Sequence, residues 1–284
     1  MYLEHFNLAS RPFNLRPDPA FLFPSEQHKL ALAVLEYGLL EQDGYVVVTG
    51  EVGSGKTTLV RHLLGKLEPD FEVGLITNTH SSFGDLLHWV TAAFGLRRES
   101  RTDAELHQTF IDHIIGVYAR GRKTLLIVDE AQNLDTGSLE EIRVLSNINA
   151  DGSHVLQLLL VGQPELREKL ADPRVTQIAQ RISTHFHLDA LAPAAIGEYI
   201  NHRLWVAGAS RPLFSQRAVD LIGRASGGVP RLINQIAETA LVYAFAANAN
   251  RVYFNTVEDV LKDRKTSKLL PVRSNLNEDL AVPS

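Results

Sequence analysis

The sequence predicts an α/β protein, in which a parallel β-sheet has helices on both faces and is followed by a small domain of helices only. Up to about residue 190, short apolar runs alternate with stretches of helical periodicity. One apolar run leads into a glycine-rich loop, and another ends in two acidic residues. Beyond that point only helical periodicity remains, which indicates the second domain.

The composition is that of a folded globular protein, and it excludes several kinds of chemistry. Of the 284 residues, 45% are hydrophobic and 21% are charged, which is ordinary for a chain with a sizeable core. A net charge of −5 gives no overall attraction to nucleic acid. The absence of cysteine rules out disulfides, thiol catalysis and cysteine metal sites. With no long apolar run and no signal-peptide pattern, we expect a cytoplasmic protein without an integral membrane segment.

Residues 1–44 are expected to form an N-terminal arm and the first helix. The arm, residues 1–27, is rich in proline and phenylalanine, which suits an extended segment anchored on the core by aromatic side chains. Ser25 is a candidate N-cap for a helix over residues 26–41, where apolar positions have helical spacing. A short turn at 43–44 then leads into the first strand.

The strand from Tyr45 leads into a loop with the pattern G-x-x-x-x-G-K-[ST], which predicts binding of the phosphates of a nucleotide such as ATP. Glycine lets backbone N–H groups approach a phosphate closely, and the start of the next helix adds more N–H donors. Lys56 supplies a positive charge for the β- and γ-phosphates, and the Thr57 hydroxyl is a ligand for Mg²⁺. The candidate nucleotide-binding residues of the loop are Gly50, Glu51, Val52, Gly53, Ser54, Gly55, Lys56, Thr57 and Thr58.

Two acidic residues end a later strand and complete the candidate site. The elements expected after the loop are strands at 72–77, 123–128, 155–161 and 184–188, and helical stretches at 86–94, 104–120, 139–149 and 165–180. A parallel strand delivers Asp129 and Glu130 to the sheet edge beside the loop, where Asp129 can hold Mg²⁺ and Glu130 can deprotonate the attacking water. The alternative, an acidic surface turn, would be favoured only without the loop.

Gln163 follows the strand at 155–161 and is expected between the loop and the acidic pair. There its amide could hydrogen-bond the γ-phosphate or the water. The alternative is an ordinary polar residue at a strand end.

The domain boundaries follow from these patterns. We expect a nucleotide-binding core over residues 45–190, a helical domain over 191–264 and a flexible tail over 265–284. Helices are expected at 194–205, 216–224, 231–245 and 257–264. The eleven histidines form no metal-binding pattern, because His185 and His187 alternate on one strand while His202 is distant in sequence.

At this point several segments resemble a known group of proteins. They are RPFNLRPDPAFLFPSEQHKLAL, GEVGSGKTTL, LLIVDEAQNL, LLLVGQPEL, QRI and GGVPRLINQIAETALVYA, and they span residues 1–262. Together they resemble AAA+ P-loop ATPases of the ORC-like branch, and more narrowly the general secretion pathway protein A (ExeA-like) family. That family includes ATPases of type IV mannose-sensitive pilus biogenesis and of exosortase or exopolysaccharide loci.

The resemblance implies roles for matching positions. Those in the nucleotide site are Lys56 and Thr57 of Walker A, Asp129 and Glu130 of Walker B, and Gln163 as sensor 1. Arg181 falls where such ATPases carry an arginine finger for a neighbouring subunit's γ-phosphate, with Arg174 as the rival. Arg231 falls at the sensor-2 position of the helical lid. For Arg181 and Arg231, an ordinary salt bridge is the alternative. In related enzymes the region around residues 24–28 approaches the adenine.

The resemblance also implies an ATPase that turns over ATP as a ring or filament, because the finger comes from the next protomer. It favours a role in envelope secretion, pilus or exopolysaccharide export, with a protein partner that can bring the chain to the inner membrane. A DNA-associated regulator of the transposition type is the alternative, and an ATP-binding adaptor is disfavoured by the intact acidic pair. Longer secretion members continue into a membrane span and a peptidoglycan-binding domain, so those properties are not expected here. Basic residues that could share a face for DNA are Arg61, His62, Arg97, Arg98, Arg101, Arg120, Arg122 and Lys123.

Overall fold

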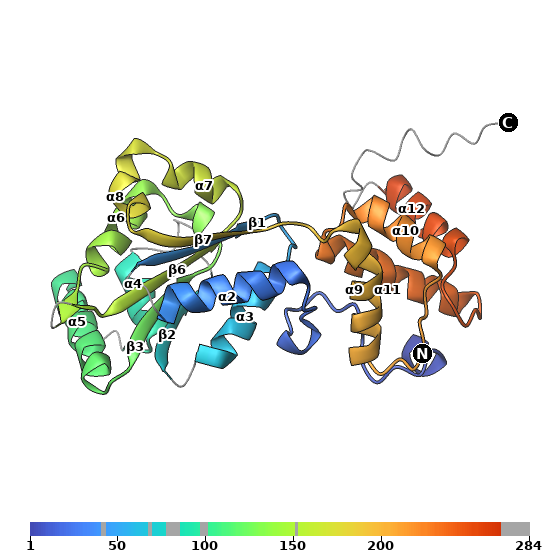
Figure 1. Ribbon diagram of the computed structural model, residues 1–284, viewed down its shortest axis with the longest axis horizontal. Helices are drawn as coiled ribbons and strands as arrows, with labels where there is room; N and C mark the ends of the chain where they lie inside the picture. The colour runs from blue at the N-terminus through green and yellow to red at the C-terminus, as the bar shows by residue number, and fades with distance from the viewer. Residues whose placement is uncertain (41–43, 68–69, 78–85, 97–101, 151–152, 268–284) are drawn as a thin grey trace. The chain divides into compact units, whose positions relative to one another are not determined.

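The computed structural model describes residues 1–40, 44–67, 70–77, 86–96, 102–150 and 153–267. These residues form two compact units (Figure 1). The first unit, here called the sheet unit, contains residues 26–51 and 56–188. The second, here called the helical unit, contains residues 1–25, the loop residues 52–55 and the chain from residue 189 onward. Each unit has an apolar core of its own.

The sheet unit is built on the predicted parallel sheet. Its strands are β1 (Tyr45–Gly50), β2 (Phe71–Ile76), β3 (Lys123–Val128), β6 (Leu156–Gly162) and β7 (Ile182–Leu188). Their spatial order is β2-β3-β6-β1-β7, and every neighbouring pair is parallel. All five carboxyl ends therefore lie at one end of the sheet. Because β1 lies between β6 and β7, the loop that follows it lies among the ends of its neighbours. A two-stranded ribbon of β4 (Asn149–Ala150) and β5 (Ser153–His154), which the sequence did not predict, precedes β6.

Helices cover both faces of the sheet, as predicted (Figure 1). They are α2 (Glu26–Leu40), α3 (Lys56–Leu67), α4 (Leu86–Ala93), α5 (Asp103–Ala119), α6 (Thr136–Leu145), α7 (Glu165–Leu170) and α8 (Thr176–Ala179). Alternation along β1 separates the two cores: Val46 and Val48 pack with α2 and α3, whereas Tyr45 and Val47 pack with the other helices. Because both faces are apolar, the inner strands β1 and β6 are buried along their whole length.

The helical unit consists of the four predicted helices and the N-terminal segment. The helices are α9 (Pro193–Val206), α10 (Gln216–Ser226), α11 (Pro230–Ala246) and α12 (Phe254–Ser267). Ser215 caps α10 through a bond from the Ala218 N–H to its hydroxyl, and Gly227 ends that helix in the left-handed conformation. Helix α12 continues past residue 264, the end predicted from the sequence. Residues 268–284 of the predicted tail lie outside the described residues. Within the described residues, no helix is both long and apolar enough to cross a bilayer.

The N-terminal arm packs on the core of the helical unit. The arm contains α1 (Tyr2–His5) and the short 3-10 helix η1 (Pro19–Phe21). Phe6, Leu8 and Phe13 are buried in the core of the helical unit. The guanidinium of Arg203 on α9 donates to the carbonyl oxygens of Pro12 and Asn14 at 2.6 and 3.2 Å. The aromatic anchors were identified correctly, but composition alone does not indicate which surface they contact.

Candidate nucleotide site

The phosphate-loop motif has the predicted strand-loop-helix geometry. The motif begins at the last residue of β1, and α3 begins at Lys56. Gly53 and Gly55 have φ angles of +82° and +108°, a region that residues with a Cβ rarely adopt. The tight turn therefore depends on glycine at these two positions, and it places the first turn of α3 at the sheet edge.

Lys56 is held against the loop in this structure. Its side chain is buried, and Nζ donates to the carbonyl oxygens of Gly50 and Glu51 at 2.7 and 3.0 Å. Burial lowers the pKa of the Lys56 ammonium, while the nearby carboxylates of Glu130 and Asp129 act in the opposite direction. The ammonium is thus held on the loop, where it can compensate phosphate charge.

Thr57 and Asp129 form a pair that fits a magnesium ion. The Thr57 hydroxyl donates to Asp129 Oδ2 at 3.2 Å, across the gap between α3 and the end of β3. A hydroxyl and a carboxylate are the hard oxygen donors that Mg²⁺ prefers. Burial raises the pKa of the Asp129 carboxyl, and bonds from the Glu130 N–H and the Thr57 hydroxyl counter this effect. The Ser54 hydroxyl is also buried and has no hydrogen-bond partner within the described residues, so it is available to bind a polar ligand at the loop.

Glu130 lies directly beyond Asp129 and has an unusual backbone conformation. Its φ and ψ are +56° and +36°, the left-handed region, and its N–H donates to Asp129 Oδ1 at 3.0 Å. A short 3-10 helix, η3 (Ala131–Asn133), follows at once. The conformation turns the chain sharply at the end of β3, so that the two neighbouring carboxylates take different positions.

The structure places Gln163 next to Glu130, and its contact with the γ-phosphate or the water stays a prediction. Gln163 follows β6, which is the neighbour of both β1 and β3, and its Nε2 lies 3.4 Å from Glu130 Oε2. Sequence reasoning missed Gln132, whose Nε2 donates to the same oxygen at 2.6 Å. The signal available for Gln132 was its place two residues after Glu130 in VDEAQNL. The site therefore contains a carboxylate with two amide partners beside the loop and the Thr57–Asp129 pair.

Arg181 lies at the opposite edge of the sheet. It directly precedes β7, and its carbonyl oxygen accepts the N–H of Tyr45, the first residue of β1. Its Nη1 donates to Ser146 Oγ at 3.3 Å, and the side chain lines a small pocket with Tyr45 and His154. The loop begins at the other end of β1, which is about 16 Å away at about 3.3 Å per strand residue. Arg181 therefore does not join the site of its own chain.

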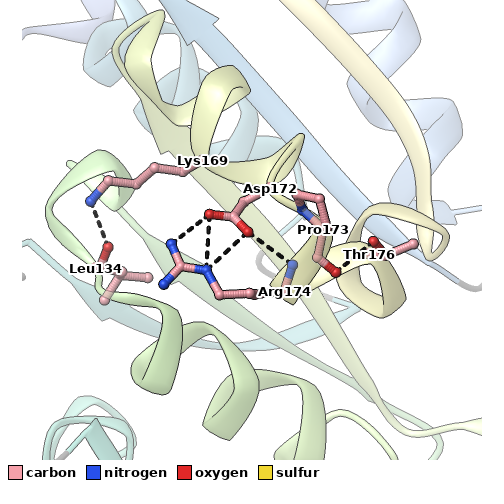
Figure 2. Close-up of polar contacts among 6 residues, drawn as sticks. All are labelled: Leu134, Lys169, Asp172, Pro173, Arg174 and Thr176. Carbon is pink, nitrogen blue, oxygen red and sulfur yellow. Dashed lines mark hydrogen bonds and ion pairs between the residues drawn. The ribbon is translucent and has the colours of Figure 1, made fainter.

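Arg174, the rival finger, is exposed on the surface of the sheet unit. It lies in the 3-10 helix η4 (Pro173–Val175), and Figure 2 shows its guanidinium against the Asp172 carboxylate. Nη2 and Nε of Arg174 donate to the carboxylate at 2.6 and 3.0 Å, and these bonds lower the pKa of Asp172 to about 2. The same view shows Lys169 donating to the carbonyl oxygen of Leu134 at 2.7 Å. Arg174 is thus paired within its own chain.

Arg231 begins α11 in the helical unit, to which the loop residues 52–55 also belong. Its backbone N–H donates to the Gly53 carbonyl oxygen at 3.1 Å. A Cβ on Gly53 would lie 2.4 Å from the Cβ of Arg231, so only glycine permits this approach. The role of the Arg231 guanidinium as sensor 2 stays a prediction. So does an adenine contact near residues 24–28, because Pro24 and His28 belong to different units.

Other predicted groups have partners of their own. His185 Nε2 and His187 Nδ1 both lie within hydrogen-bond distance of Thr49 Oγ1, at 3.0 and 2.9 Å. In the basic set, Arg120 and Arg122 form ion pairs with Glu72. Arg97, Arg98 and Arg101 lie outside the described residues. A shared basic face for DNA therefore stays a prediction.

Comparisons with known proteins agree with this geometry. Residues 40–170 match the family model described as an AAA domain. General secretion pathway protein A of Aeromonas hydrophila is 41% identical over 253 residues, which are 89% of this chain and 46% of that protein. Together these matches support the ExeA-like AAA ATPase that the sequence motifs predicted. It spans about half the length of this curated relative, so what that protein does as a whole does not transfer directly.

Solved structures similar to this ExeA-like protein share its fold at low sequence identity. The ORC2 protein of Aeropyrum pernix in ADPNP-ADP complexes has a TM-score of 0.66 at 19% identity, covering 92% of this chain and 74% of that one. Drosophila ORC bound to DNA has a TM-score of 0.68 at 19% identity, with coverage of 93% and 68%. RuvB of Thermotoga maritima has a TM-score of 0.56 at 15% identity, with coverage of 86% and 70%. These likenesses confirm the predicted P-loop AAA fold.

Proposed function

We propose that this ExeA-like protein is a Mg²⁺-dependent ATPase that acts as an assembly switch for an envelope secretion, pilus or exopolysaccharide export system. The observation that carries the proposal is the convergence of Lys56, Thr57, Asp129 and Glu130 on one sheet edge, with Thr57 and Asp129 in direct contact at 3.2 Å. The envelope role is supported by the likeness to General secretion pathway protein A.

The chain's residues have separate tasks in the proposed reaction. Loop N–H groups and Lys56 bind the phosphates of ATP, while Thr57 and Asp129 hold Mg²⁺. Bound Mg²⁺ supplies positive charge that offsets the charge developing on the phosphates. Glu130 orients the attacking water and takes its proton, and the side-chain amide of Gln163 contacts the γ-phosphate or that water.

Turnover would be tied to assembly because Arg181 is too far from its own loop. We propose that it reaches the γ-phosphate bound by a neighbouring protomer in a ring or filament. Arg231 would report the nucleotide state to the helical unit. A protein partner of the export machine would receive this signal and hold the ATPase at the cytoplasmic face of the inner membrane.

The first experiment measures ATP turnover by the wild type and by Lys56→Ala. We expect the variant to lose ATP binding and turnover, because the loop loses its only lysine. Lys66→Ala is the matched control, since Lys66 is on the same helix, is half-exposed and pairs with Glu36 at 2.7 Å. Turnover that survives in Lys56→Ala would place the reaction elsewhere.

The same assay distinguishes an export role from the DNA alternative. Turnover would be measured with and without duplex DNA at about physiological salt, where weak phosphate attraction is largely screened. If ATP turnover per protein molecule rises with protein concentration and does not change when DNA is added, the result would support a self-assembling ATPase with a protein partner. Strong stimulation by DNA, absent from Lys56→Ala, would favour the transposition-type regulator.

A further inference from the structure

We propose that Gln132 is a positioning residue for Glu130. Its side-chain amide connects the carboxylate to the backbone of Gln163 at the end of the neighbouring strand. Nε2 donates to Glu130 Oε2 at 2.6 Å, and Oε1 accepts the N–H of Gln163 at 3.0 Å. The inference rests on the proposed function of Glu130 as the base.

The orientation of the Gln132 amide is fixed by its two partners. The Gln163 N–H can only donate, so the amide oxygen must face it, and an ionised carboxylate can only accept, so the NH₂ group must face Glu130. In the reverse orientation, the NH₂ group would face the N–H of Gln163 and the amide oxygen would face the Glu130 carboxylate, so neither hydrogen bond could form. One side chain thus sets the distance between the carboxylate and the end of β6.

The local fold prepares this contact in two ways. The left-handed conformation of Glu130 and the 3-10 turn after it bring Gln132 back over the Glu130 side chain, and the buried Ala131 anchors the turn in the core. Gly162, the last residue of β6, leaves room for the amide, because a Cβ there would lie 2.9 Å from Gln132 Oε1. Neither feature is needed merely to end a strand.

Gln132 and Gln163 hold the carboxylate differently. The side chain of Gln163 is 3.4 Å from Glu130 Oε2 and can turn toward a phosphate without moving its backbone N–H. Gln132 is bonded to that N–H, so its hold on Glu130 persists when the Gln163 side chain turns away. Gln132 should therefore affect the rate of the chemical step and leave ATP binding unchanged, since its hydrogen bonds go to Glu130 and to the backbone of Gln163.

The main test is Gln132→Met, which keeps the length of the side chain and removes both hydrogen bonds. We expect kcat for ATP to fall about 10- to 100-fold, because misplacing a reacting group by about 1 Å can cost about 100-fold. KM and the affinity for an ATP analogue should stay within about twofold of wild type. The matched control is Gln108→Met, since Gln108 is exposed on α5 and its amide donates to Asp112 at 2.8 Å.

A second variant separates positioning from a structural role. Gln132→Glu keeps an oxygen acceptor for the Gln163 N–H but cannot donate to Glu130 when ionised. A purely structural role predicts near-normal kcat for this variant, whereas positioning predicts a loss as large as in Gln132→Met. Circular dichroism and binding of the ATP analogue show whether Gln132→Met folds. If it does not fold, Gln132→Glu provides the test instead.

A double-mutant cycle completes the test. In a Glu130→Gln background, Gln132→Met should cost nothing further in single-turnover measurements, because the group that it positions is already lost. An unchanged kcat in Gln132→Met, or an equal loss in both backgrounds, overturns the inference. If the wild type shows no ATP turnover that depends on Lys56, the proposed function fails together with the inference. If the wild type shows such turnover and Gln132→Met has the same kcat, only the inference fails.

Discussion

At the residue scale, the candidate site holds two charged groups that burial disfavours. Burial lowers the pKa of Lys56 and raises that of Asp129, so the protein environment works against both charges. Each group is compensated by local partners: two loop carbonyls for Lys56, and the Thr57 hydroxyl with the Glu130 N–H for Asp129. Bound Mg²⁺ and phosphate carry the opposite charges, so we expect ligand binding to replace these internal partners with stronger ones.

Gly162→Ala tests how closely β6 must approach the catalytic turn. The added Cβ would lie 2.9 Å from both Gln132 Oε1 and Leu166 Cδ2, so one of these side chains must move. We expect a loss of about 1–3 kcal/mol in the free energy of unfolding, typical of overpacking, and a fall in kcat. Urea unfolding and ATP turnover measure the two effects. Gly65→Ala is the control, because its added Cβ meets nothing within 4 Å; equal behaviour of the two variants would contradict the prediction.

Sequence patterns identified those residues whose spacing reflects chemistry. Lys56 and Thr57 follow from the loop pattern, and Asp129 and Glu130 from an apolar strand that ends in acids beside it. Gln132 was missed because its position depends on the left-handed conformation of Glu130, a strained backbone state that no periodicity indicates. Non-glycine residues with this conformation are uncommon, so sequence alone gave no reason to expect the turn.

At the scale of elements, the strands were easier to predict than the arm. An apolar run such as 156–162 is buried on both faces in a parallel sheet whatever its partners are, so its pattern suffices. The arm has no repeating pattern, and the surface that it contacts is set by tertiary partners such as Arg203. Phe21 and Phe23 illustrate this, because Arg203 lies over the Phe21 ring and Tyr199 contacts the Phe23 ring edge to face.

Arg203→Met should detach the arm from the helical unit. The substitution leaves the buried carbonyl oxygen of Pro12 without the guanidinium, and a buried polar group that loses its partner costs about 1–3 kcal/mol. We expect about 1–3 kcal/mol less stability in urea unfolding and faster proteolysis within residues 1–25. Arg211→Met is the control, since Arg211 is exposed and donates to the Asn250 carbonyl oxygen at 3.3 Å. The idea fails if both variants unfold alike.

At the scale of the whole molecule, the proposed finger and the phosphate loop lie at opposite ends of one protomer's sheet. Arg181 lies beside the start of β1, whereas the loop follows the end of that strand. The proposed mechanism therefore takes its finger from a second copy, through a head-to-tail interface that repeats the contact. Arg174 is bonded to Asp172 and would need to break that pair before it could act.

Mixing two inactive variants tests this arrangement directly. Arg181→Ala keeps its nucleotide residues but lacks the finger, and we expect a loss of about 10³–10⁵ in rate. Glu130→Gln keeps the finger but lacks the base. In an equal mixture, an Arg181→Ala site regains its finger whenever its neighbour is Glu130→Gln, so random assembly should restore roughly a quarter of wild-type turnover. Measuring ATP turnover at increasing protein concentration would follow this recovery. No recovery in a mixture shown to co-assemble would exclude Arg181 as the finger, and recovery with Arg174→Ala in its place would assign that role to Arg174.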